Sequence, residues 1–317
     1  MLHLDDDTVA SLLDLPSVTE VVGEAFVAWG RGTAATTQRV RATTAEGMAS
    51  AMAAVVPPYT GGKVYATVDG RFTFVNVLFD LGGQFLCTLD GDALTRFRTP
   101  AGCALAIRHL AAPEPATAAL IRAGNQGWYH LEMLAAELPG LREVRAHDLR
   151  PDAAGALAAR GAAAGIPVRA VPRAIDAVDG ADVVVTVTRA TEPLFPAAAV
   201  GPRTLICAVG ATKYDRCEIG ADVVEACAAI VCDDVAGSRV ECGDLIHAAR
   251  AGRFDWAQAV ELHAVSAGTA AVPRAGDAPV LFETQGVALQ DVAASGLAWE
   301  RYCRASQDVT HPKEEIA

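Results

Sequence analysis

The chain has 317 residues, enough for two domains, and its net charge of −12 argues against nucleic acid or an anionic membrane surface as a partner, because both favour clustered lysine and arginine. No apolar run approaches the roughly 18 residues that a membrane span needs, and the acidic N-terminus lacks the layout of a signal peptide. The eight cysteines are scattered without zinc spacing, so we expect reduced thiols, no metal site and a cytoplasmic protein.

The first third of the chain predicts an α+β domain. Residues 1 to about 30 favour a pair of helices with a break at Pro16. Three β-like runs follow, separated by Asp69-Gly70 and Gly82-Gly83 turns, at 63–67, 72–79 and 84–89. Ala101 to Ala112 is predicted as a helix, and Pro113 to Pro115 indicates the boundary with the next domain.

From Ala116 onward, strands alternate with helices, which predicts a parallel, doubly wound α/β sheet of the Rossmann type. The predicted strands are near 118–122, 143–147, 167–171, 183–187, 204–209 and 229–233. Ligands bind such sheets at the carboxyl ends of the strands. We therefore expect one crevice to contain the segments 123–126, 148, 186–189 and 209–216. The helical segment Val287 to Arg301 has no sheet left to join and is expected to pack on the first domain.

The turn after the first of these strands resembles the start of a dinucleotide-binding unit, where backbone N–H groups at a helix start hold a pyrophosphate. Its first glycine is replaced by Arg122. If this position needs a left-handed backbone, a non-glycine residue costs about 1–2 kcal/mol. Three readings stay open: the guanidinium obstructs the pyrophosphate, it pairs with phosphate or swings outward, or cofactor binding has been lost. Asp148 ends the next strand, where the ribose-binding acid is expected.

Basic residues are concentrated in the first domain. The chain contains 23 arginines and only three lysines, which are Lys63, Lys213 and Lys313. Lys63 opens a β-like run, where an ammonium beside apolar walls has a lowered pKa and exchanges protons near neutral pH; the alternative is an ordinary lysine at a strand edge. The segment from 31 to 71 contains two acidic residues, Glu46 and Asp69, and five basic residues, which are Arg31, Arg39, Arg41, Lys63 and Arg71. This excess favours an anionic small molecule, and the alternative is a solvated face without a ligand.

Arginine also occurs at the expected start of the helix that leads to the domain boundary, in Arg96-Phe97-Arg98-Thr99. A cation there opposes the helix dipole. A bound anion would explain it, as would simple surface placement.

Several stretches together resemble the ornithine cyclodeaminase/mu-crystallin family over nearly the whole chain. The segment Thr95–Ala101 is similar to its T-x-x-R-T-x-A motif, and 122–126 to its G-x-G-x-Q. Further matches to its T-x-T, A-V-G, E-L/I-D, E-x-G-D-L and L-F-x-S-x-G-x-A-x-Q-D elements are 186–188, 208–210, 218–219, 240–245 and 281–292. The order and spacing of these motifs carry the resemblance.

The resemblance implies a homodimer with a substrate and dimerisation domain over 1–113 and 285–317, and a Rossmann domain over 114–284. It also implies a nicotinamide cofactor, NAD with NADP possible because of Arg150, and a small α-amino or α-imino acid as substrate. The implied catalytic positions are Lys63, Arg39, Arg98 and Thr212. The implied cofactor-binding positions are Thr99, Arg122, Gly124, Asn125, Gln126, Asp148, Thr188, Val209, Gly210, Arg216 and Thr284.

Departures from the family pattern narrow the expected chemistry. Cyclodeaminases carry an aspartate where this chain has Thr212, which cannot act as a base, and their substrate-amine glutamate corresponds to Ser50. The common F-K-S reads Phe282-Glu283-Thr284. We therefore expect an NAD(P)H-dependent imino-acid reductase or amino-acid dehydrogenase, with a non-catalytic small-ligand binder as the alternative and a cyclodeaminase third.

Overall fold

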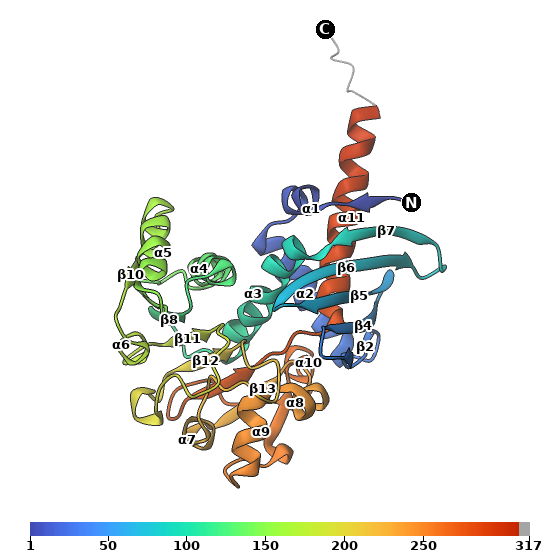
Figure 1. Cartoon of the computed structure of the whole chain (residues 1–317). Helices are drawn as coiled ribbons and strands as arrows, with labels where there is room; N and C mark the ends of the chain where they lie inside the picture. The colour runs from blue at the N-terminus through green and yellow to red at the C-terminus, as the bar shows by residue number, and fades with distance from the viewer. Residues whose placement is uncertain (311–317) are drawn as a thin grey trace. The chain divides into compact units, whose positions relative to one another are not determined.

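The computed structural model describes residues 1–310, which form two compact units (Figure 1). The first unit comprises Met1–Arg98 and the segment that begins at Val287, and the second comprises Thr99–Gly286. The boundary after Arg98 differs from the one expected at Pro113–Pro115. It falls inside a helix, and the proline-rich stretch is only a short loop. Residues 311–317, including Lys313, lie outside the described part. Within residues 1–310, no helix combines the length and apolar character needed to cross a membrane.

A seven-stranded sheet forms the framework of the first unit. Its strands follow the order β1-β7-β6-β5-β4-β2, and β3 pairs with β4. Their bounds are β1 His3–Leu4, β2 Ala35–Thr36, β3 Val40–Thr43, β4 Met48–Val56, β5 Tyr59–Val68, β6 Arg71–Asp80 and β7 Phe85–Asp90. The three β-like runs expected at 63–67, 72–79 and 84–89 are confirmed as parts of β5, β6 and β7.

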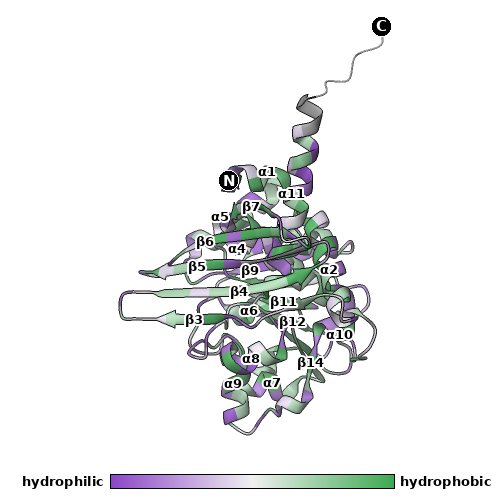
Figure 2. Cartoon of the chain, turned by 90° about the vertical axis from the view of Figure 1, so that its right-hand side faces the viewer, coloured by the Kyte–Doolittle hydropathy of each residue, from purple (hydrophilic) through white to green (hydrophobic). Residues whose placement is uncertain are grey.

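The strand alternation gives this sheet one buried and one exposed face. Lys63 and Tyr65 are buried, whereas Val64 between them is exposed. β5 and β6 are joined at Asp69-Gly70, whose φ angles of 50° and 73° are those of a type I′ hairpin turn. Figure 2 shows how hydrophobic colour extends along these strands.

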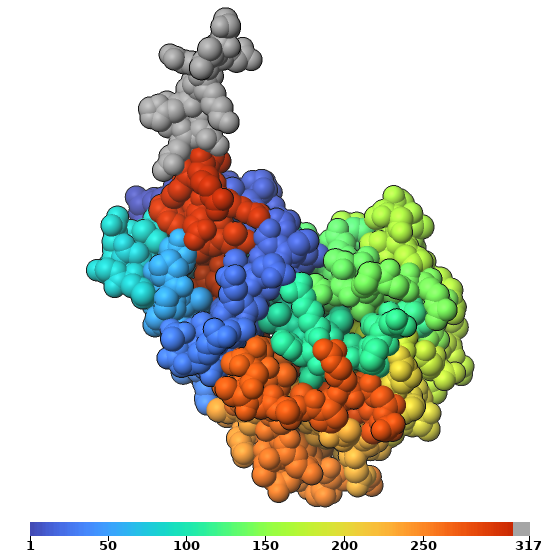
Figure 3. Space-filling view, turned by 180° about the vertical axis from the view of Figure 1, so that it is seen from behind, coloured from blue at the N-terminus to red at the C-terminus, as the bar shows by residue number. Residues whose placement is uncertain are grey.

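One long helix covers the buried face, and a second long helix packs on it. The helices of this unit are α1 Asp6–Leu12, α2 Leu15–Gly30 and α11 Ala288–Thr310. α11 packs against α2 and strands β4, β5 and β6, and the rear view shows it beside the N-terminal segment (Figure 3). The expected break at Pro16 is confirmed, because Asp14 caps α2 by accepting from the Ser17 N–H at 2.8 Å.

Helix α3 (Gly91–Leu110) begins ten residues before the expected start at Ala101. The Asp6 carboxylate accepts from the Ala93 N–H at 2.8 Å and so caps the helix from a distant part of the chain, a contact that local sequence does not reveal. The expectation that Arg98 stands at a helix start is therefore wrong. Arg98 and Thr99 lie in the middle of α3, where the dipole argument does not apply.

The second unit contains an eight-stranded, wholly parallel sheet in the order β10-β9-β8-β11-β12-β15-β13-β14. Its strands are β8 Thr117–Ile121, β9 Glu143–His147, β10 Val168–Ala170, β11 Val183–Thr186, β12 Leu205–Ala208, β13 Ala229–Cys232, β14 Ala259–Glu261 and β15 Val280–Glu283. The six predicted strands are confirmed. β14 and β15 were missed, and β15 inserts between β12 and β13 although it comes last in sequence.

Short helices accompany this sheet, and the fold class is confirmed as α/β with a parallel sheet. They are α4 Asn125–Glu137, α5 Pro151–Ala163, α6 Ala174–Val178, α7 Ala221–Ala226, α8 Val235–Glu241, α9 Gly243–Arg250 and α10 Leu262–Ser266. A buried apolar cluster joins the sheet to α6, α7 and α9 through residues such as Val178, Val223, Leu245 and Leu281. This packing fixes the carboxyl ends of the strands, where the second unit carries its candidate site.

Candidate active site

Lys63 lies on the buried face of β5, with 1% of its surface exposed. Its ammonium donates to Thr95 Oγ1 at 2.7 Å and to Asp291 Oδ1 at 3.0 Å. The ring of Phe74, on neighbouring β6, lies 4.3 Å from Nζ to its centroid. The strand-edge alternative is wrong, because β5 pairs with β4 on one side and with β6 on the other.

Asp291, which sequence analysis placed in a motif but gave no role, joins two cations. This residue lies in the first turn of α11 and is buried. Its Oδ1 is 3.3 Å from Arg98 Nε in addition to the contact with Lys63. Arg98 also donates from Nη1 to Gln290 Oε1 at 3.3 Å. The aspartate of the final Q-D motif was the available signal, and its meaning depends on contacts with residues far away in the chain.

The electrostatics of this cluster favour proton exchange near neutral pH. Burial lowers the pKa of Lys63, the Asp291 carboxylate opposes this, and Arg98 and Arg39 lower it further, to about 8. Burial alone would raise the pKa of Asp291, but the charges of Arg98 and Lys63 outweigh it and hold that pKa below its usual range. Asp291 is therefore ionised at neutral pH, and Lys63 is mostly protonated but able to lose its proton.

Arg39 belongs to the same electrostatic cluster and places a third cation near Lys63 and Asp291. Its Nη2 lies 3.8 Å from Met52 Sδ on β4, the strand next to β5. The formal charge of Arg39, Lys63, Arg98 and Asp291 is 3 − 1 = +2. This excess suits a small carboxylate ligand.

Two neutral polar side chains lie on the same buried face. Asn76 is directly opposite Lys63 on β6, and Ser50 is on β4. Within residues 1–310, neither the Asn76 amide nor the Ser50 hydroxyl has a hydrogen-bond partner, although both are buried. Buried polar groups of this kind have partners in most folded proteins, so these two are available to a polar ligand.

Two other basic residues of the first domain lie away from this cluster. Arg31 is the exposed C-cap of α2, and Arg71 is exposed at the start of β6. Arg41 lies on β3 in register with Ser50. Directly paired residues point to the same face, so Arg41 shares the face of Ser50. The five basic residues still do not form one surface, because Arg31 and Arg71 are exposed on other elements.

In the second unit, Arg122 follows β8 with a φ of 106°, in the left-handed region that favours glycine. The backbone at Arg122 is therefore left-handed, and a residue with a side chain is strained there. Gly127, in the first turn of α4, lies against the same turn, and a Cβ there would be 2.3 Å from the Arg122 carbonyl oxygen. Glycines for close helix packing occupy this place in dinucleotide-binding turns, so Gly127 is a functional position that sequence analysis left out.

The start of α4 has no side-chain cap. Its N-cap is Gly124, which has no side chain for capping, and the helix begins with Asn125 and Gln126. The Gln126 carbonyl oxygen accepts a hydrogen bond from Nδ1 of His130, one turn later, at 2.8 Å. The N–H groups at the start of a 13-residue helix without a side-chain cap suit a phosphate group.

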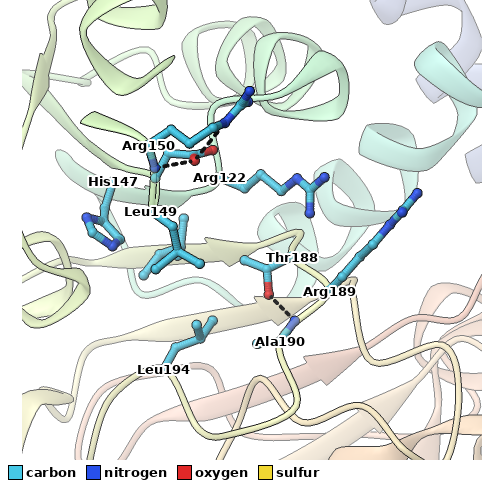
Figure 4. Close-up of a pocket in the computed structure, with 10 residues that line it drawn as sticks. Arg122, His147, Leu149, Arg150, Thr188, Arg189, Ala190 and Leu194 are labelled. Carbon is cyan, nitrogen blue, oxygen red and sulfur yellow. Dashed lines mark hydrogen bonds and ion pairs between the residues drawn. The ribbon is translucent and has the colours of Figure 1, made fainter. Parts of the chain in front are cut away.

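A cavity of about 490 Å³ opens beside this turn, at the carboxyl ends of β8, β9 and β11 (Figure 4). Its lining residues are Ile121, Arg122, His147, Asp148, Leu149, Arg150, Thr188, Arg189, Ala190 and Leu194. Asp148 accepts from the Ala123 N–H and from the Arg150 N–H, each at 2.9 Å. The expected grouping of 123–126, 148 and 186–189 at one sheet edge agrees with this arrangement.

Glu218, which received no role from sequence alone, fixes two loops of that edge. Its buried carboxylate accepts from Thr186 Oγ1 at 2.9 Å, from the Thr188 N–H at 2.5 Å and from the Gly210 N–H at 2.6 Å. A Cβ on Gly210 would be 2.1 Å from the Thr188 carbonyl oxygen. Thr188 and Gly210, two of the three residues expected beside a nicotinamide, are thus held by one carboxylate, and the Val209 N–H donates to the Thr186 carbonyl oxygen at 2.9 Å.

The remaining expected residues have structural partners. Arg216 donates from Nη1 to the Arg189 carbonyl oxygen at 2.5 Å, and the Thr212 N–H donates to the Gly210 carbonyl oxygen at 2.9 Å. Thr284 donates from Oγ1 to Asp233 Oδ2 at 2.6 Å and is buried. The Thr284 hydroxyl therefore donates its hydrogen bond within the protein and not to a ligand.

Three carboxyl groups meet in the interior of the second unit: Glu218, Asp244 and Glu283 are all buried. Burial raises the pKa of Asp244 to about 7, with the charge of Glu218 adding to the effect. Burial, and then the charge of Asp244, raise the pKa of Glu283 well above its usual value. Glu283 stands where the family commonly has lysine, so this departure replaces a cation with a third acid.

Replacing Glu283 with glutamine should stabilise the protein, and the gain should be larger at pH 8 than at pH 5. A carboxyl whose folded pKa is raised stabilises the fold fully only below its unfolded pKa, and this stability is lost as pH rises through the window up to the folded pKa. Glutamine removes that loss, which amounts to at most about 1.4 kcal/mol per pH unit. Urea unfolding at both pH values measures it. Glu192→Gln, at an exposed site, should show no such dependence; an equal effect of Glu283→Gln at both pH values would contradict the prediction.

In the described part of the chain, no three or more histidine, cysteine, aspartate or glutamate side chains are arranged so that they could hold a metal ion, and the eight cysteines form no disulfide.

Comparisons with known proteins agree with this geometry. A model described as the ornithine cyclodeaminase/mu-crystallin family matches residues 2–306. The chain is 33% identical over 317 residues, covering 96% of it and 94% of the relative, to the Delta(1)-pyrroline-2-carboxylate/Delta(1)-piperideine-2-carboxylate reductase of Azospirillum brasilense. It is similar, at a TM-score of 0.90 and 25% identity, to Thermococcus litoralis Delta(1)-pyrroline-2-carboxylate reductase in complex with NADH and L-proline, covering 96% of this chain and 98% of that one. An archaeal alanine dehydrogenase dimer with bound NAD gives a TM-score of 0.91 at 25% identity, over 96% and 97% of the two chains.

Proposed function

The chain belongs to the ornithine cyclodeaminase/mu-crystallin family, and on this basis we propose that it is an NAD(P)H-dependent reductase of an imino acid, able to run in reverse as an amino-acid dehydrogenase. The observation that carries the proposal is the buried Lys63, whose pKa is lowered to about 8 beside Asp291 and two arginines. Imine reduction needs a carboxylate clamp and a proton donor, and this cluster contains both.

The roles of the first unit follow from its contacts. Arg39 and Arg98 bind the substrate carboxylate through charge-assisted hydrogen bonds. The Lys63 ammonium donates its proton to the imine nitrogen, because its lowered pKa makes it a competent acid near neutral pH. Asp291 is a positioning residue that holds the ammonium and keeps it protonated.

The second unit fits a dinucleotide. The close packing at Gly127, the uncapped start of α4 and the cavity beyond Asp148 form a continuous edge of the parallel sheet. Asn125 and Gln126 would hold the pyrophosphate, Asp148 the adenosine ribose, and Thr188, Val209 and Gly210 the nicotinamide. When bound, the reduced dinucleotide supplies the hydride that the C=N carbon accepts.

Two cyclic substrates test the proposal directly, since the Azospirillum relative is named for both. Oxidation of NADH or NADPH should follow the addition of Delta(1)-pyrroline-2-carboxylate or Delta(1)-piperideine-2-carboxylate, and L-proline or L-pipecolate should form. The strain at Arg122 favours one second candidate, a small-ligand binder without a dinucleotide. A thermal shift separates the two: a dinucleotide at 100 times its Kd should stabilise the protein by about 2.7 kcal/mol, and no shift with either cofactor supports the second candidate. Ammonia release from L-ornithine would instead indicate a cyclodeaminase.

We further propose that the protein forms a homodimer through the exposed face of the first sheet and works in the cytoplasm, where its unpaired cysteines stay reduced. That face carries exposed apolar side chains on neighbouring strands, including Val40 on β3, Val64 on β5 and Val75 on β6. A shallow cavity of about 520 Å³ lies on it where Gly61 and Gly62 lack side chains. Exposed apolar surfaces of this kind are typical of interfaces.

Replacing Val64 with lysine should convert the dimer to a monomer. Val64 is 54% exposed in the isolated chain, so the charge is harmless to the fold but buried without a partner in the interface. Sedimentation velocity measures the change in mass. Val240→Lys, at an exposed position on α8 in the second unit, should leave the dimer intact; a wild-type protein that is a monomer would rule out the dimer itself.

A further inference from the structure

Aromatic side chains continue the buried face of the first sheet beyond Lys63. Tyr65 follows Lys63 on the same side of β5 and is directly opposite Phe74 on β6. Phe72 precedes Phe74 on the same side of β6. Alternate residues of a strand point to one face, so the three rings share the face of the Lys63 ammonium. The centroids of Phe72 and Phe74 are 5.6 Å apart with ring planes at 3°, and the Tyr65 centroid is 5.2 Å from Phe74 and 6.2 Å from Phe72. We call these three rings the aromatic cluster.

The aromatic cluster begins at the proposed proton donor. The Phe74 ring centroid is 4.3 Å from Lys63 Nζ. Helix α11 runs from Lys63 in the other direction: Asp291, in its first turn, contacts the ammonium, and a Cβ on Gly296 would be 2.6 Å from the Tyr59 ring. Tyr59 is at the start of β5, before Lys63. The aromatic cluster therefore extends the Lys63 site on the side away from the course of α11.

Two hydroxyls flank the aromatic cluster. Ser50, on β4, is directly opposite Tyr65, and Thr67 is the next residue of β5 on the same face. Within residues 1–310, neither Ser50 Oγ nor Thr67 Oγ1 has a hydrogen-bond partner, although both atoms are buried. The two residues are diagonal neighbours on adjacent strands, so their hydroxyls lie at one end of the cluster. An unpaired buried hydroxyl costs free energy, and these two indicate that the ligand supplies a polar group.

We propose that the aromatic cluster, Ser50 and Thr67 bind the substrate side chain, and that the preferred substrate is an α-imino acid whose side chain is an aromatic ring with a hydroxyl group. The inference rests on the proposed function, because Lys63 and the arginines hold the imine and the carboxylate of the same molecule. Aromatic rings pack with centroids about 4.5–7 Å apart, so a substrate ring adds to the cluster in the geometry its own rings have. Phe72 is 38% exposed and leaves room for that contact. The two protein hydroxyls then pair with the hydroxyl of the substrate.

Arg41 defines the competing occupant of this subsite. It is directly opposite Ser50 and shares its face. A cation there would favour a side chain that ends in a second carboxylate. Arg41 already has an interaction within the protein, however, whereas the hydroxyls of Ser50 and Thr67 have none in the described part of the chain. The neutral aromatic side chain is therefore the better match, and a dicarboxylic imino acid is an outcome of the test.

Reductive amination of four 2-oxo acids tests the subsite. Ammonium converts 4-hydroxyphenylpyruvate, phenylpyruvate, pyruvate and oxaloacetate to α-imino acids that differ only in the side chain, and oxidation of NADH or NADPH gives kcat/KM for each. The 4-hydroxyphenyl compound should exceed the phenyl compound at least about tenfold, and the phenyl compound should exceed pyruvate at least about tenfold. A higher kcat/KM with oxaloacetate, or with Delta(1)-pyrroline-2-carboxylate, would overturn the inference and leave the reductase standing.

Variants assign the preference to the named side chains. Phe72→Ala should lower the preference for phenylpyruvate over pyruvate about tenfold. Ser50→Ala combined with Thr67→Val should lower the preference for 4-hydroxyphenylpyruvate over phenylpyruvate about tenfold. Val68→Ala is the matched control, because exposed Val68 is at the same end of β5 but points to the opposite face. It should change both preferences by no more than about twofold. Preferences that stay at the wild-type level in the first two variants would remove these side chains from the subsite and overturn the inference.

Binding of the product amino acids separates this inference from the proposed function. Calorimetric titration with L-tyrosine, L-phenylalanine and L-alanine needs no hydride transfer. If L-tyrosine binds most tightly but no imino acid is reduced with either cofactor, the subsite is supported and the reductase is overturned. Equal affinity for the three amino acids overturns the subsite, whatever the rates of reduction.

Discussion

Replacing Lys63 with methionine should lower kcat for imino-acid reduction by about two to four orders of magnitude, the usual contribution of a positioned general acid. Methionine fills a similar volume beside Phe74 but has no proton to donate. Arg39 and Arg98 remain, so binding of the product amino acid should change much less than kcat. Steady-state rates together with calorimetric titration of L-proline measure the two effects.

The pH dependence and a second variant separate proton donation from charge. The donor must be protonated, so the wild-type rate should fall as pH rises above the Lys63 pKa of about 8. Lys63→Arg keeps the positive charge beside Asp291 but does not release a proton near pH 8. Its kcat should therefore be as low as that of Lys63→Met. Full activity in either variant would remove Lys63 from the mechanism.

Replacing Asp291 with asparagine should destabilise the protein by about 3–5 kcal/mol, because removing one partner of a buried ion pair leaves the other charge uncompensated. Asp291 is 1% exposed and lies against both Lys63 and Arg98. The same change removes the carboxylate that raises the Lys63 pKa, so the alkaline fall in rate should move to lower pH. Urea unfolding and a pH–rate profile measure these effects.

A matched control lies elsewhere in the first unit. Asp14 pairs with Arg301 at 2.7 Å on the surface, where such ion pairs contribute about 1 kcal/mol or less. Asp14→Asn retains a side chain that can cap α2 and should therefore have little effect on stability. If Asp14→Asn and Asp291→Asn lowered the free energy of unfolding by similar amounts, the buried ion pairs of Asp291 would contribute no more to stability than a surface ion pair.

Hydrophobic periodicity predicted most of the secondary structure, because strands such as β8 and β9 are continuous apolar or alternating runs bounded by turns. β14 was missed because three residues are too few for a periodic signal. β15 was missed because α10, the helix before it, has only five residues and the stretch 267–279 between them contains no helix. The start of α3 was placed too late because its cap comes from Asp6, which is 87 residues away from Ala93.

The candidate site shows a similar division. Residue type and spacing pointed to Lys63, Arg98 and the turn at Arg122. The left-handed backbone there, which sequence analysis considered as one possibility, is what the structure contains. Asp291 could not be assigned from local pattern, because its contact with Lys63 spans 228 residues. The role of Glu218 was equally hidden: a carboxylate that binds backbone N–H groups of two loops has no local sequence pattern.

The position of β15 has a consequence for how the second sheet folds during synthesis. Val280–Glu283 pairs with β12 on one side and β13 on the other, so these two strands have no direct partnership of their own. Until synthesis has passed residue 283, the nascent sheet remains two separate halves with unpaired edges facing each other. Such edges bind chaperones or other nascent chains, so slow translation just before Val280 should prolong the stage at which this protein is most prone to aggregate.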